Sequence, residues 1–363
     1  MLIYPLIALN AAAGLVNPGD DIFAREKALG HIETRIVAKS TDAEYFAFPS
    51  VCKLKNGDLL CVFYNGTAHV CPDSKISMVR STDEGKTWSK PVTIIDTPMD
   101  DRDPSIRQTR DGRILVNFFI RDSGTTGAAK QTNKVLVSGS DDGGRTFGEP
   151  KTIGTDWLWE ATSDEILELK DGTLLLPIYG AARGSKTWGA AVAFSRDGGL
   201  TWDKGPIAVV AYDDSDDPVR FEEPALVQLP TGDVICALRT TNADGFIYET
   251  RSRDGGKTWT PFRRLGLQGQ ASNLLYHSSG VVFQAYRDRL GTGEVRGVAG
   301  IFRRLGNDWD AKKQFSILNI GGDCAYPSSV ELKDGSILTV YYARERRSIE
   351  STTLYPAAIK ALR

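Results

Sequence analysis

One eight-residue phrase, Ser-x-Asp-x-Gly-x-Thr followed by an aromatic residue, occurs four times in this chain of 363 residues. The copies begin 59, 55 and 57 residues apart. A repeat of this length fits one four-stranded blade of a β-propeller and is longer than the units of helical solenoids. We therefore expect an all-β fold built from repeated sheets. The four copies are Ser81–Trp88, Ser140–Phe147, Ser195–Trp202 and Ser252–Trp259.

A second repeat gives the number of units. Six short turns end in glycine and stand between apolar runs, which is a strong signal for β-hairpins with type I′ turns, in which both central residues have positive φ. We therefore predict a six-bladed propeller that forms a single domain over residues 1–363, with residues 1–30 as an N-terminal extension. The turns are Asn56-Gly57, Asp111-Gly112, Asp171-Gly172, Thr231-Gly232, Ser279-Gly280 and Asp334-Gly335.

The two ends of the chain are expected to close the ring. The last hairpin is followed by Thr352 to Ala361, which we predict to be its third strand, and the chain then stops. We predict that residues within 33–38 supply the missing outer strand. Pairing the first and last segments would remove an exposed sheet edge, which otherwise promotes aggregation.

Composition argues against two classes of partner. The net charge of −2, with acidic and basic residues mixed, shows no footprint for nucleic acid. No run of eighteen apolar residues occurs, so we expect no membrane span. The expected partner is a glycan or a small acidic sugar, and the oligomeric state stays open. The cysteines are odd in number and lack metal-ligand spacing, so we expect buried reduced thiols at Cys52, Cys61, Cys71, Cys236 and Cys324.

The N-terminal segment bears on the compartment. Residues 2–14 are apolar and contain Asn10-Ala11-Ala12-Ala13, which is similar to a secretory cleavage site. A basic segment does not precede them, so we expect no cleaved signal and favour the cytoplasm. A secreted or periplasmic location is the alternative.

Strand order predicts where a ligand binds. In each repeat the innermost strand leads into the glycine turn. The start of this strand and the end of the strand after the turn therefore lie at the end of the sheet opposite the turn, where they line a central funnel. Arg102, Glu160, Asp164 and Glu222 are in the same segments. Side chains alternate along a strand, so only one of the adjacent Glu222 and Glu223 is expected to face the funnel. The funnel positions are Phe48, Asp103, Ser163, Glu223, Ala271 and Tyr326, followed by Tyr64, Phe119, Tyr179, Arg239, Arg287 and Tyr342.

The repeated phrase itself is expected to be structural. Its serine and aspartate can accept hydrogen bonds from backbone N–H groups of a tight turn, and its glycine can take a strained dihedral angle. The aromatic residue can pack between neighbouring sheets. The chemistry is therefore expected at the funnel.

The four boxes and six hairpins resemble the sialidase (neuraminidase) superfamily of six-bladed propellers over about residues 40–345. Glu223 precedes Arg239 by 16 residues, as a glutamate and a triad arginine do in that family. Tyr326 opens a segment similar to the strand with the family's nucleophile, and Asp73 lies eight residues before the first box, as the family's acid/base aspartate does. The resemblance implies Tyr326 as nucleophile, Glu223 as its base and Asp73 as general acid, without a metal or other cofactor.

The chain also departs from the family pattern. The arginine of the family's Arg-Ile-Pro motif, which grips the substrate carboxylate, is replaced by Ala47, and Gly66 stands where a second arginine is expected. Tyr342 replaces a glutamate. Arg296 is a candidate for the remaining triad arginine, with Arg287 as its rival. Arg102 together with Arg287 is a candidate for a rebuilt carboxylate clamp.

Four further residues have two interpretations each. His69 lies on the loop after the second strand, where it could replace or assist Asp73 as the acid or simply bond to the backbone. Trp157, Trp159 and Trp188 could stack on sugar faces or pack between sheets.

Three functions are compatible with these residues. The first is a retaining exo-acting glycoside hydrolase of sialidase type that releases a terminal acidic sugar, such as sialic acid or a related keto sugar acid. The second keeps the fold but uses two carboxylates, Glu160 or Asp103 with Glu223, on a neutral sugar such as arabinose, an arrangement that resembles sialidase-like exo-arabinanases. The third is a carbohydrate-binding propeller without catalysis.

Overall fold

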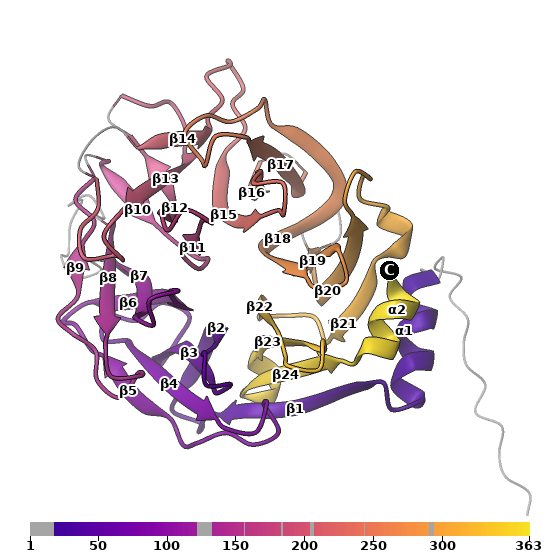
Figure 1. Ribbon diagram of the computed structural model, residues 1–363. Coiled ribbons are helices and arrows are strands. Elements are labelled where there is room, and N and C mark those ends of the chain that lie inside the picture. The colour runs from indigo at the N-terminus through magenta and orange to yellow at the C-terminus, as the bar shows by residue number, and fades with distance from the viewer. Residues whose placement is uncertain are drawn as a thin grey trace, which may run out of the picture.

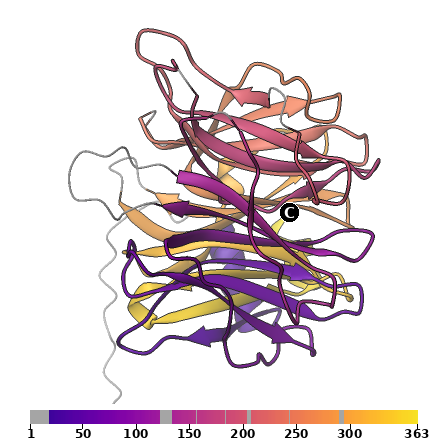
Figure 2. The same cartoon turned by 90° about the vertical axis from the view of Figure 1, so that its left-hand side faces the viewer.

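The structure is a computed structural model that describes residues 18–121, 133–155, 157–182, 184–203, 207–242, 244–289 and 294–363. Antiparallel sheets stand around a common centre (Figure 1). In the view turned by 90° the strands run roughly across the picture (Figure 2). The all-β prediction is confirmed for the described residues. The apolar segment 2–14, like all of residues 1–17 of the predicted N-terminal extension, lies outside them.

Three sheets of the described chain have four strands each, all antiparallel. Two of them are consecutive in sequence, as the repeat predicts, and the third combines the two ends of the chain. The first contains β2 (Tyr45–Lys53), β3 (Leu59–Gly66), β4 (Lys75–Ser81) and β5 (Val92–Ile95). The second contains β6 (Asp100–Gln108), β7 (Ile114–Arg121), β8 (Asn133–Ser140) and β9 (Lys151–Thr152). The third contains β22 (Cys324–Glu331), β23 (Ile337–Ala343), β24 (Ser348–Leu354) and β1 (Ile32–Lys39).

The remaining strands form a five-stranded and a seven-stranded sheet. In the larger one the 15-residue β18 pairs with β17 and with β19, so two predicted blades share one strand. The closed six-bladed ring therefore stays a prediction. The smaller sheet contains β10 (Trp159–Ala161), β11 (Leu167–Glu168), β12 (Leu174–Ala181), β13 (Gly189–Ser195) and β14 (Ala208–Ala211). The larger contains β15 (Phe221–Gln228), β16 (Val234–Thr240), β17 (Phe246–Ser252), β18 (Arg263–His277), β19 (Val281–Arg289), β20 (Val295–Arg304) and β21 (Phe315–Asn319).

The N-terminal strand pairs with the C-terminal one. β1 runs antiparallel to β24 from Ile32 opposite Leu354 to Lys39 opposite Ser348, which confirms the predicted outer strand within residues 33–38. The predicted third strand over 352–361 is correct only for its first three residues, since β24 spans Ser348–Leu354. Residues Pro356–Leu362 form α2 instead, because a proline at the first turn fits a helix start.

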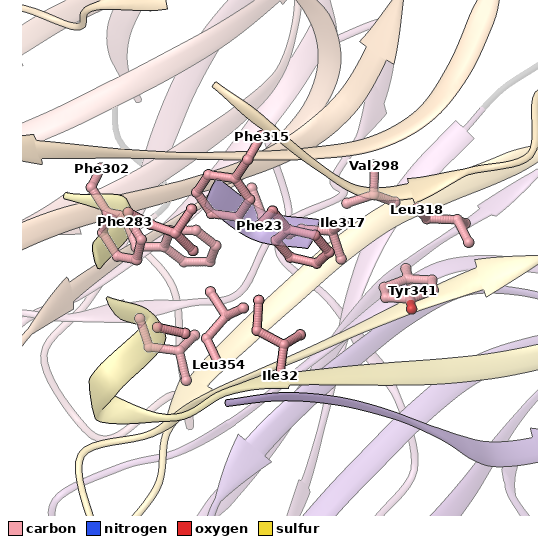
Figure 3. Close-up of a cluster of buried hydrophobic side chains, with 14 of the residues drawn as sticks. Phe23, Ile32, Phe283, Val298, Phe302, Phe315, Ile317, Leu318, Tyr341 and Leu354 are labelled. Carbon is pink, nitrogen blue, oxygen red and sulfur yellow. The ribbon is translucent and has the colours of Figure 1, made fainter. Parts of the chain in front are cut away.

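A hydrophobic cluster fixes both ends of the described chain to the sheets. Phe23 of α1 (Pro18–Ala28) stacks on Phe315 with ring centroids 5.5 Å apart, and Figure 3 shows both rings beside Phe283 and above Ile32 and Leu354. Each buried aromatic ring of this kind contributes roughly 1.5–3 kcal/mol. No helix in the described part of the chain is long and apolar enough to cross a membrane.

The four repeated phrases have the predicted structural role. In the first, Ser81 Oγ accepts a hydrogen bond from the Gly85 N–H at 2.8 Å, and Asp83 Oδ1 accepts one from the Thr87 N–H at 2.9 Å. The other three phrases repeat these bonds. Each box glycine has positive φ and faces a leucine of the neighbouring sheet. The boxes are therefore joints between sheets.

The hairpins form as predicted but with another turn type. Gly57 has a φ of 95°, whereas Asn56 does not have positive φ. The Gly57 N–H donates to the Leu54 carbonyl at 2.9 Å, and the Leu54 N–H to Asp58 at 2.8 Å. This is a type I turn followed by a left-handed glycine, so the predicted type I′ turn is wrong. All five cysteines are buried and unpaired, as predicted.

Candidate active site

The innermost strands share one backbone irregularity at the predicted funnel positions. Five residues have φ between 46° and 51°, a region that non-glycine residues rarely occupy. A register shift accompanies each, so each is a β-bulge. Proline follows four of them and disfavours right-handed helical geometry in the residue before it. The five residues are Phe48, Asp103, Glu223, Ala271 and Tyr326.

These bulges bring distant segments together. Phe48, Asp103, Ala271 and Tyr326 line one narrow cavity of about 20 Å³ together with Ser163. The Ser163 hydroxyl donates to Asp103 Oδ2 at 3.2 Å. The predicted convergence of the innermost strands is therefore present in the structure.

The bulges also overturn one sequence-based expectation. Glu222 and Glu223 are adjacent, yet both line the same larger cavity. Strict alternation would send one of them away, but the left-handed conformation of Glu223 interrupts the pleat. Arg102 and Asp103 show the same behaviour at the bulge of β6.

This larger cavity has a volume of about 300 Å³, within the range of small-molecule sites. Hollows of about 500 and 460 Å³ lie elsewhere; the smaller of the two is lined by Trp157, but neither is lined by a predicted catalytic residue or by a predicted substrate-binding arginine. The cavity combines a phenol, carboxylates, guanidinium groups and indole rings, so we take it as the candidate active site. Its lining is Arg102, Asp103, Phe119, Arg121, Asn133, Trp159, Tyr179, Trp188, Arg220, Glu222, Glu223, Arg239 and Tyr326.

Tyr326 and Glu223 are in direct contact. The Tyr326 hydroxyl donates a hydrogen bond to Glu223 Oε1 at 2.6 Å. Arg239 Nη1 donates to the same oxygen at 2.5 Å, and the Ala271 N–H donates to Oε2 at 3.0 Å. Three donors thus orient a carboxylate whose side chain is only 4% exposed. Such a carboxylate is placed to accept the phenolic proton.

Two pKa shifts describe the electrostatics of the cavity. Burial, with the nearby carboxylates of Glu223 and Asp103, raises the pKa of Tyr326 well above its usual value. Burial also raises the pKa of Asp103 to about 6, against the opposing charge of Arg102 and helped by the charge of Glu223. Asp103 Oδ1 is buried without a hydrogen-bond partner among the described residues. Below about pH 6 this carboxyl therefore holds a proton, as a general acid lining the cavity would need.

Arg102 is largely neutralised by its neighbours. It donates to Asp100 Oδ2 at 3.2 Å and to the His69 carbonyl at 2.6 Å, and it lies 3.9 Å from Asp103 Oδ1. Its guanidinium also faces the ring of Phe48 at 5.3 Å. Arg102 thus lines the cavity but already has ionic partners.

A second polar cluster stands beside the cavity around Asp323. This carboxylate accepts hydrogen bonds from Tyr342 at 2.6 Å and from Tyr45, and His69 Nδ1 lies 3.3 Å away. Although burial opposes ionisation, the hydrogen bonds from His69, Tyr342 and Tyr45 hold the pKa of Asp323 below its usual range. The His69 ring lies edge-on to Phe48, which in turn contacts Tyr326. His69 is therefore fixed by a carboxylate rather than by backbone groups alone.

Several predicted site residues lie outside the cavity lining. Asp73 is exposed on its loop. Arg296 is 45% exposed and pairs with Asp288 at 2.8 Å. Arg287 and Tyr342 belong to the Asp323 cluster, with Arg287 Nη2 3.9 Å from Asp323 Oδ1. The structure therefore does not bring Arg296 or Arg287 together with Arg239 in the lining of one pocket, as a rebuilt triad would require.

Glu160 is also not in the lining. It is fully buried and accepts hydrogen bonds from the Val135 N–H at 3.1 Å and from the Thr155 hydroxyl. These bonds join two neighbouring sheets. Glu160 thus has a structural role between the sheets. Of the two predicted partners of Glu223, Asp103 is the one that lines the cavity, together with Glu222 and Glu223.

The aromatic wall is formed by two of the three predicted tryptophans. Trp159 and Trp188 stack with centroids 4.1 Å apart, and the Arg220 guanidinium lies over the Trp188 ring at 3.1 Å. Trp157 is 93% buried in the core of the sheet instead. Trp159 and Trp188 line the cavity, where the indole groups can contribute apolar contact to a sugar.

Sequence reasoning missed Asp323, Arg121, Asn133 and Arg220. Asp323 and Arg220 precede their strands outside any recognisable motif. Arg121, however, could have been found, since it stands nine residues after the hairpin glycine Gly112, as Gly66 does after Gly57. The strand pairing confirms that Arg121 and Gly66 occupy equivalent positions, because Arg121 pairs with the first residue of β6 and Gly66 pairs with the first residue of β2.

Comparison with known proteins identifies the family. Residues 57–340 match the family model described as BNR repeat-like domain. A sialidase of Paraclostridium sordellii is 27% identical over 191 residues, which are 45% of this chain and 47% of that protein. The chain thus spans about half the length of this curated relative.

Solved structures share the fold. A protein of unknown function from Dyadobacter fermentans superposes with a TM-score of 0.76 at 24% identity, over 89% of this chain and 98% of that one. A Hadza microbial sialidase gives 0.70 at 19% identity, over 86% and 66%. An alpha-L-arabinanase of Penicillium chrysogenum gives 0.67 at 15% identity, over 89% and 97%. The repeats, the sheets and the family match together show that this chain belongs to the BNR repeat-like family of the sialidase superfamily.

Proposed function

We propose that this protein is a retaining exo-glycosidase of sialidase type that releases a terminal acidic sugar, the class that includes sialic acid and related keto sugar acids. The single observation that carries the proposal is the 2.6 Å hydrogen bond from Tyr326 to Glu223 on the wall of a cavity of about 300 Å³. The proposed scaffold is a closed six-bladed propeller that forms one domain over residues 1–363, with 1–30 as an extension.

The proposed reaction uses three residues. The Tyr326 oxygen attacks the anomeric carbon while its proton passes to Glu223. The bond to the leaving oxygen breaks, and that oxygen takes the proton held by Asp103. Water then attacks the anomeric carbon and gives a proton to Asp103, the bond from that carbon to the Tyr326 oxygen breaks, and Tyr326 recovers its proton from Glu223. Two displacements give net retention.

A phenol suits this substrate class for an electrostatic reason. A carboxylate nucleophile would meet repulsion from an acidic sugar, whereas Tyr326 starts neutral and gains charge only as it attacks. Asp103 replaces Asp73 in this proposal because Asp103 lines the cavity and Asp73 is exposed on its loop. His69 is the rival acid, oriented by Asp323 and Tyr45.

A second candidate is a glycosidase with two carboxylates acting on a neutral sugar. It is favoured by the placement of Asp103 and Glu223 in the same cavity, where the charge of Glu223 helps raise the pKa of Asp103. In that reaction Tyr326 would only orient Glu223. The two candidates therefore differ in the atom that becomes glycosylated.

Hydrolysis of aryl glycosides tests the proposal. The purified protein would be assayed with aryl sialosides, their deaminated analogues, aryl uronides and aryl arabinosides, and trapped intermediates would be mapped by mass spectrometry. We expect release from an acidic sugar and a glycosyl adduct on Tyr326. An adduct on Glu223 with a neutral sugar would establish the second candidate instead. Binding of glycans without turnover of any substrate would overturn both and favour a binding module.

A further inference from the structure

The charges that line the cavity do not cancel evenly. Arg220 pairs with Glu222 at 2.6 Å, Arg239 pairs with Glu222 and Glu223, and Arg102 pairs with Asp100 and Asp103. Arg121 has no ionic partner among the described residues, and its buried Nε atom has no hydrogen-bond partner there. A guanidinium in this position carries a desolvation cost that a bound anion would relieve.

A second unpartnered group stands directly beside it. Asn133 is the cross-strand neighbour of Arg121, is 97% buried and lines the same cavity. Its Oδ1 atom has no hydrogen-bond partner among the described residues. Buried side-chain amides are nearly always bonded, so this pair is set up to meet polar groups of a ligand.

The position of this pair relative to Tyr326 is informative. Tyr326, Asp103 and Glu223 stand on the innermost strands β22, β6 and β15. Arg121 is the last residue of β7, and Asn133 is the first of β8, the second and third strands of their sheet. The cavity therefore runs from a nucleophile on its inner wall to a guanidinium and an amide on its outer wall.

A keto sugar acid carries its carboxylate on the very carbon that the nucleophile attacks. On the side where the family's clamp would hold that group, this chain has Ala47 and Gly66, and Gly66 pairs with Tyr45. Tyr45 donates to Asp323, whose carboxylate is held ionised by its hydrogen bonds. On that side an anionic group on the attacked carbon would thus meet the Asp323 carboxylate and phenols, and the one arginine of this cluster named above, Arg287, already lies 3.9 Å from Asp323.

We infer that Arg121 and Asn133 bind an anionic substituent remote from the anomeric carbon, as in the carboxylate of a hexuronic acid. The inference rests on the proposed glycosidase function and narrows its substrate class from terminal acidic sugars in general to those charged at the far side of the ring. Arg121 donates to the anion, Asn133 bonds a neighbouring hydroxyl, and the indole groups of Trp159 and Trp188 give the sugar apolar contact.

Equilibrium binding tests this inference without turnover. The 363-residue chain would be titrated calorimetrically with D-glucuronate, D-galacturonate, the neutral parents glucose and galactose, and N-acetylneuraminate. We expect one uronate to bind at least about tenfold more tightly than its neutral parent, since charge-assisted hydrogen bonds to one guanidinium account for about 10- to 100-fold in affinity. R121M should remove this preference, R121K should retain part of it, and the exposed R196M should leave it unchanged.

Three outcomes would overturn the inference. They are equal affinity for uronates and neutral parents, failure of both uronates to bind, and N-acetylneuraminate binding that is insensitive to R121M. Thermal unfolding of R121M and R121K would verify that the variants fold. The aryl glycoside hydrolysis assays described above test the glycosidase proposal separately, because they follow turnover rather than the binding preference.

Discussion

Tyr326 and Glu223 are 103 residues apart in sequence, yet their side chains share a hydrogen bond of 2.6 Å. Both residues have positive φ on the innermost strands of different sheets. The two bulges aim a phenol and a carboxylate at each other across the centre of the molecule. The catalytic proposal depends on this contact.

Removing the phenolic oxygen should abolish turnover. We expect Y326F to lower kcat/KM by about 10³-fold or more, because phenylalanine has no oxygen to attack the anomeric carbon and Glu223 then has no phenolic proton to accept. The ring of Tyr326 would keep its packing on Phe48. Y341F is the matched control, because Tyr341 is a buried tyrosine whose hydroxyl bonds Thr352 and not the cavity. Equal activity of Y326F and wild type would contradict the proposed nucleophile.

The raised pKa of Asp103 predicts a pH profile. An acid with a pKa of about 6 is protonated below that pH, so kcat/KM should fall as the pH rises through about 6. D103N should be nearly inactive with a natural leaving group and should lose this limb with an activated aryl leaving group. Steady-state kinetics from pH 4 to 9 would check it. A limb that persists in D103N would transfer the acid role to His69.

The same carboxyl predicts a linked change in stability. Its pKa rises from a reference of 3.8 to about 6 in the folded protein, so the folded state holds the proton more tightly than the unfolded chain. The free energy of unfolding should therefore fall between about pH 4 and pH 6 by up to about 3 kcal/mol. The asparagine of D103N does not titrate, so the free energy of unfolding of D103N should not show this fall. As the pH rises from about 4 to about 6, the free energy of unfolding of D103N should therefore increase relative to that of wild type by up to about 3 kcal/mol. Urea unfolding at several pH values would measure it, and a constant difference would contradict the buried, coupled carboxyl.

Asp323 should show the opposite dependence. Its lowered pKa means that the folded state favours the ionised carboxylate, so its contribution to stability is present above about pH 4 and is lost as the pH falls below it. D323N should destabilise the protein at pH 7 by about 1–3 kcal/mol, since it leaves Tyr45, Tyr342 and His69 with a weaker acceptor. The difference should shrink in acid. Chemical unfolding at pH 3 and pH 7 would measure the difference in the free energy of unfolding between D323N and wild type. An equal difference at both pH values would contradict a role for the ionised carboxylate.

The box glycines should be more sensitive to substitution than the hairpin glycines. Gly199 has a φ of 84°, and a Cβ there would lie 2.6 Å from Leu115 of the next sheet. G199A should therefore cost the backbone strain of about 1 kcal/mol plus about 1–3 kcal/mol of overpacking. Gly57 has a φ of 95° with nothing within 4 Å of its Cβ position, so G57A should cost only the first term. Equal losses in urea unfolding would show that the box is not a packed joint.

Much of the fold could be predicted from local chemistry. Ser81 and Asp83 accept hydrogen bonds from backbone N–H groups within the same repeated phrase, so the structure of the phrase can be predicted from its own residues. The glycine turns reveal the hairpins for the same reason, although the turn type depends on whether Asn56 also takes positive φ. Both features depend on short stretches of chain.

The site could be predicted only in part because it depends on relations between sheets. Spacing grouped Glu223, Arg239, Tyr326 and Asp103, and these four residues line one cavity. It could not foresee that a left-handed bulge would turn Glu222 inward beside Glu223. No local sequence pattern identifies Asp323, because its contacts are with Tyr45 and His69, which are more than 250 residues away in sequence.

The recurring bend at the innermost strands accommodates phenylalanine, aspartate, glutamate, alanine and tyrosine with nearly the same φ. The main-chain path there is therefore set by the bulge and the sheet rather than by the side chain that the bend presents. Ala271 is the smallest of the five, and its N–H already contacts Glu223. An engineer could exchange the residue at this position to add a new functional group to the reaction centre while keeping the scaffold, so chemistry and architecture can diverge independently in this chain.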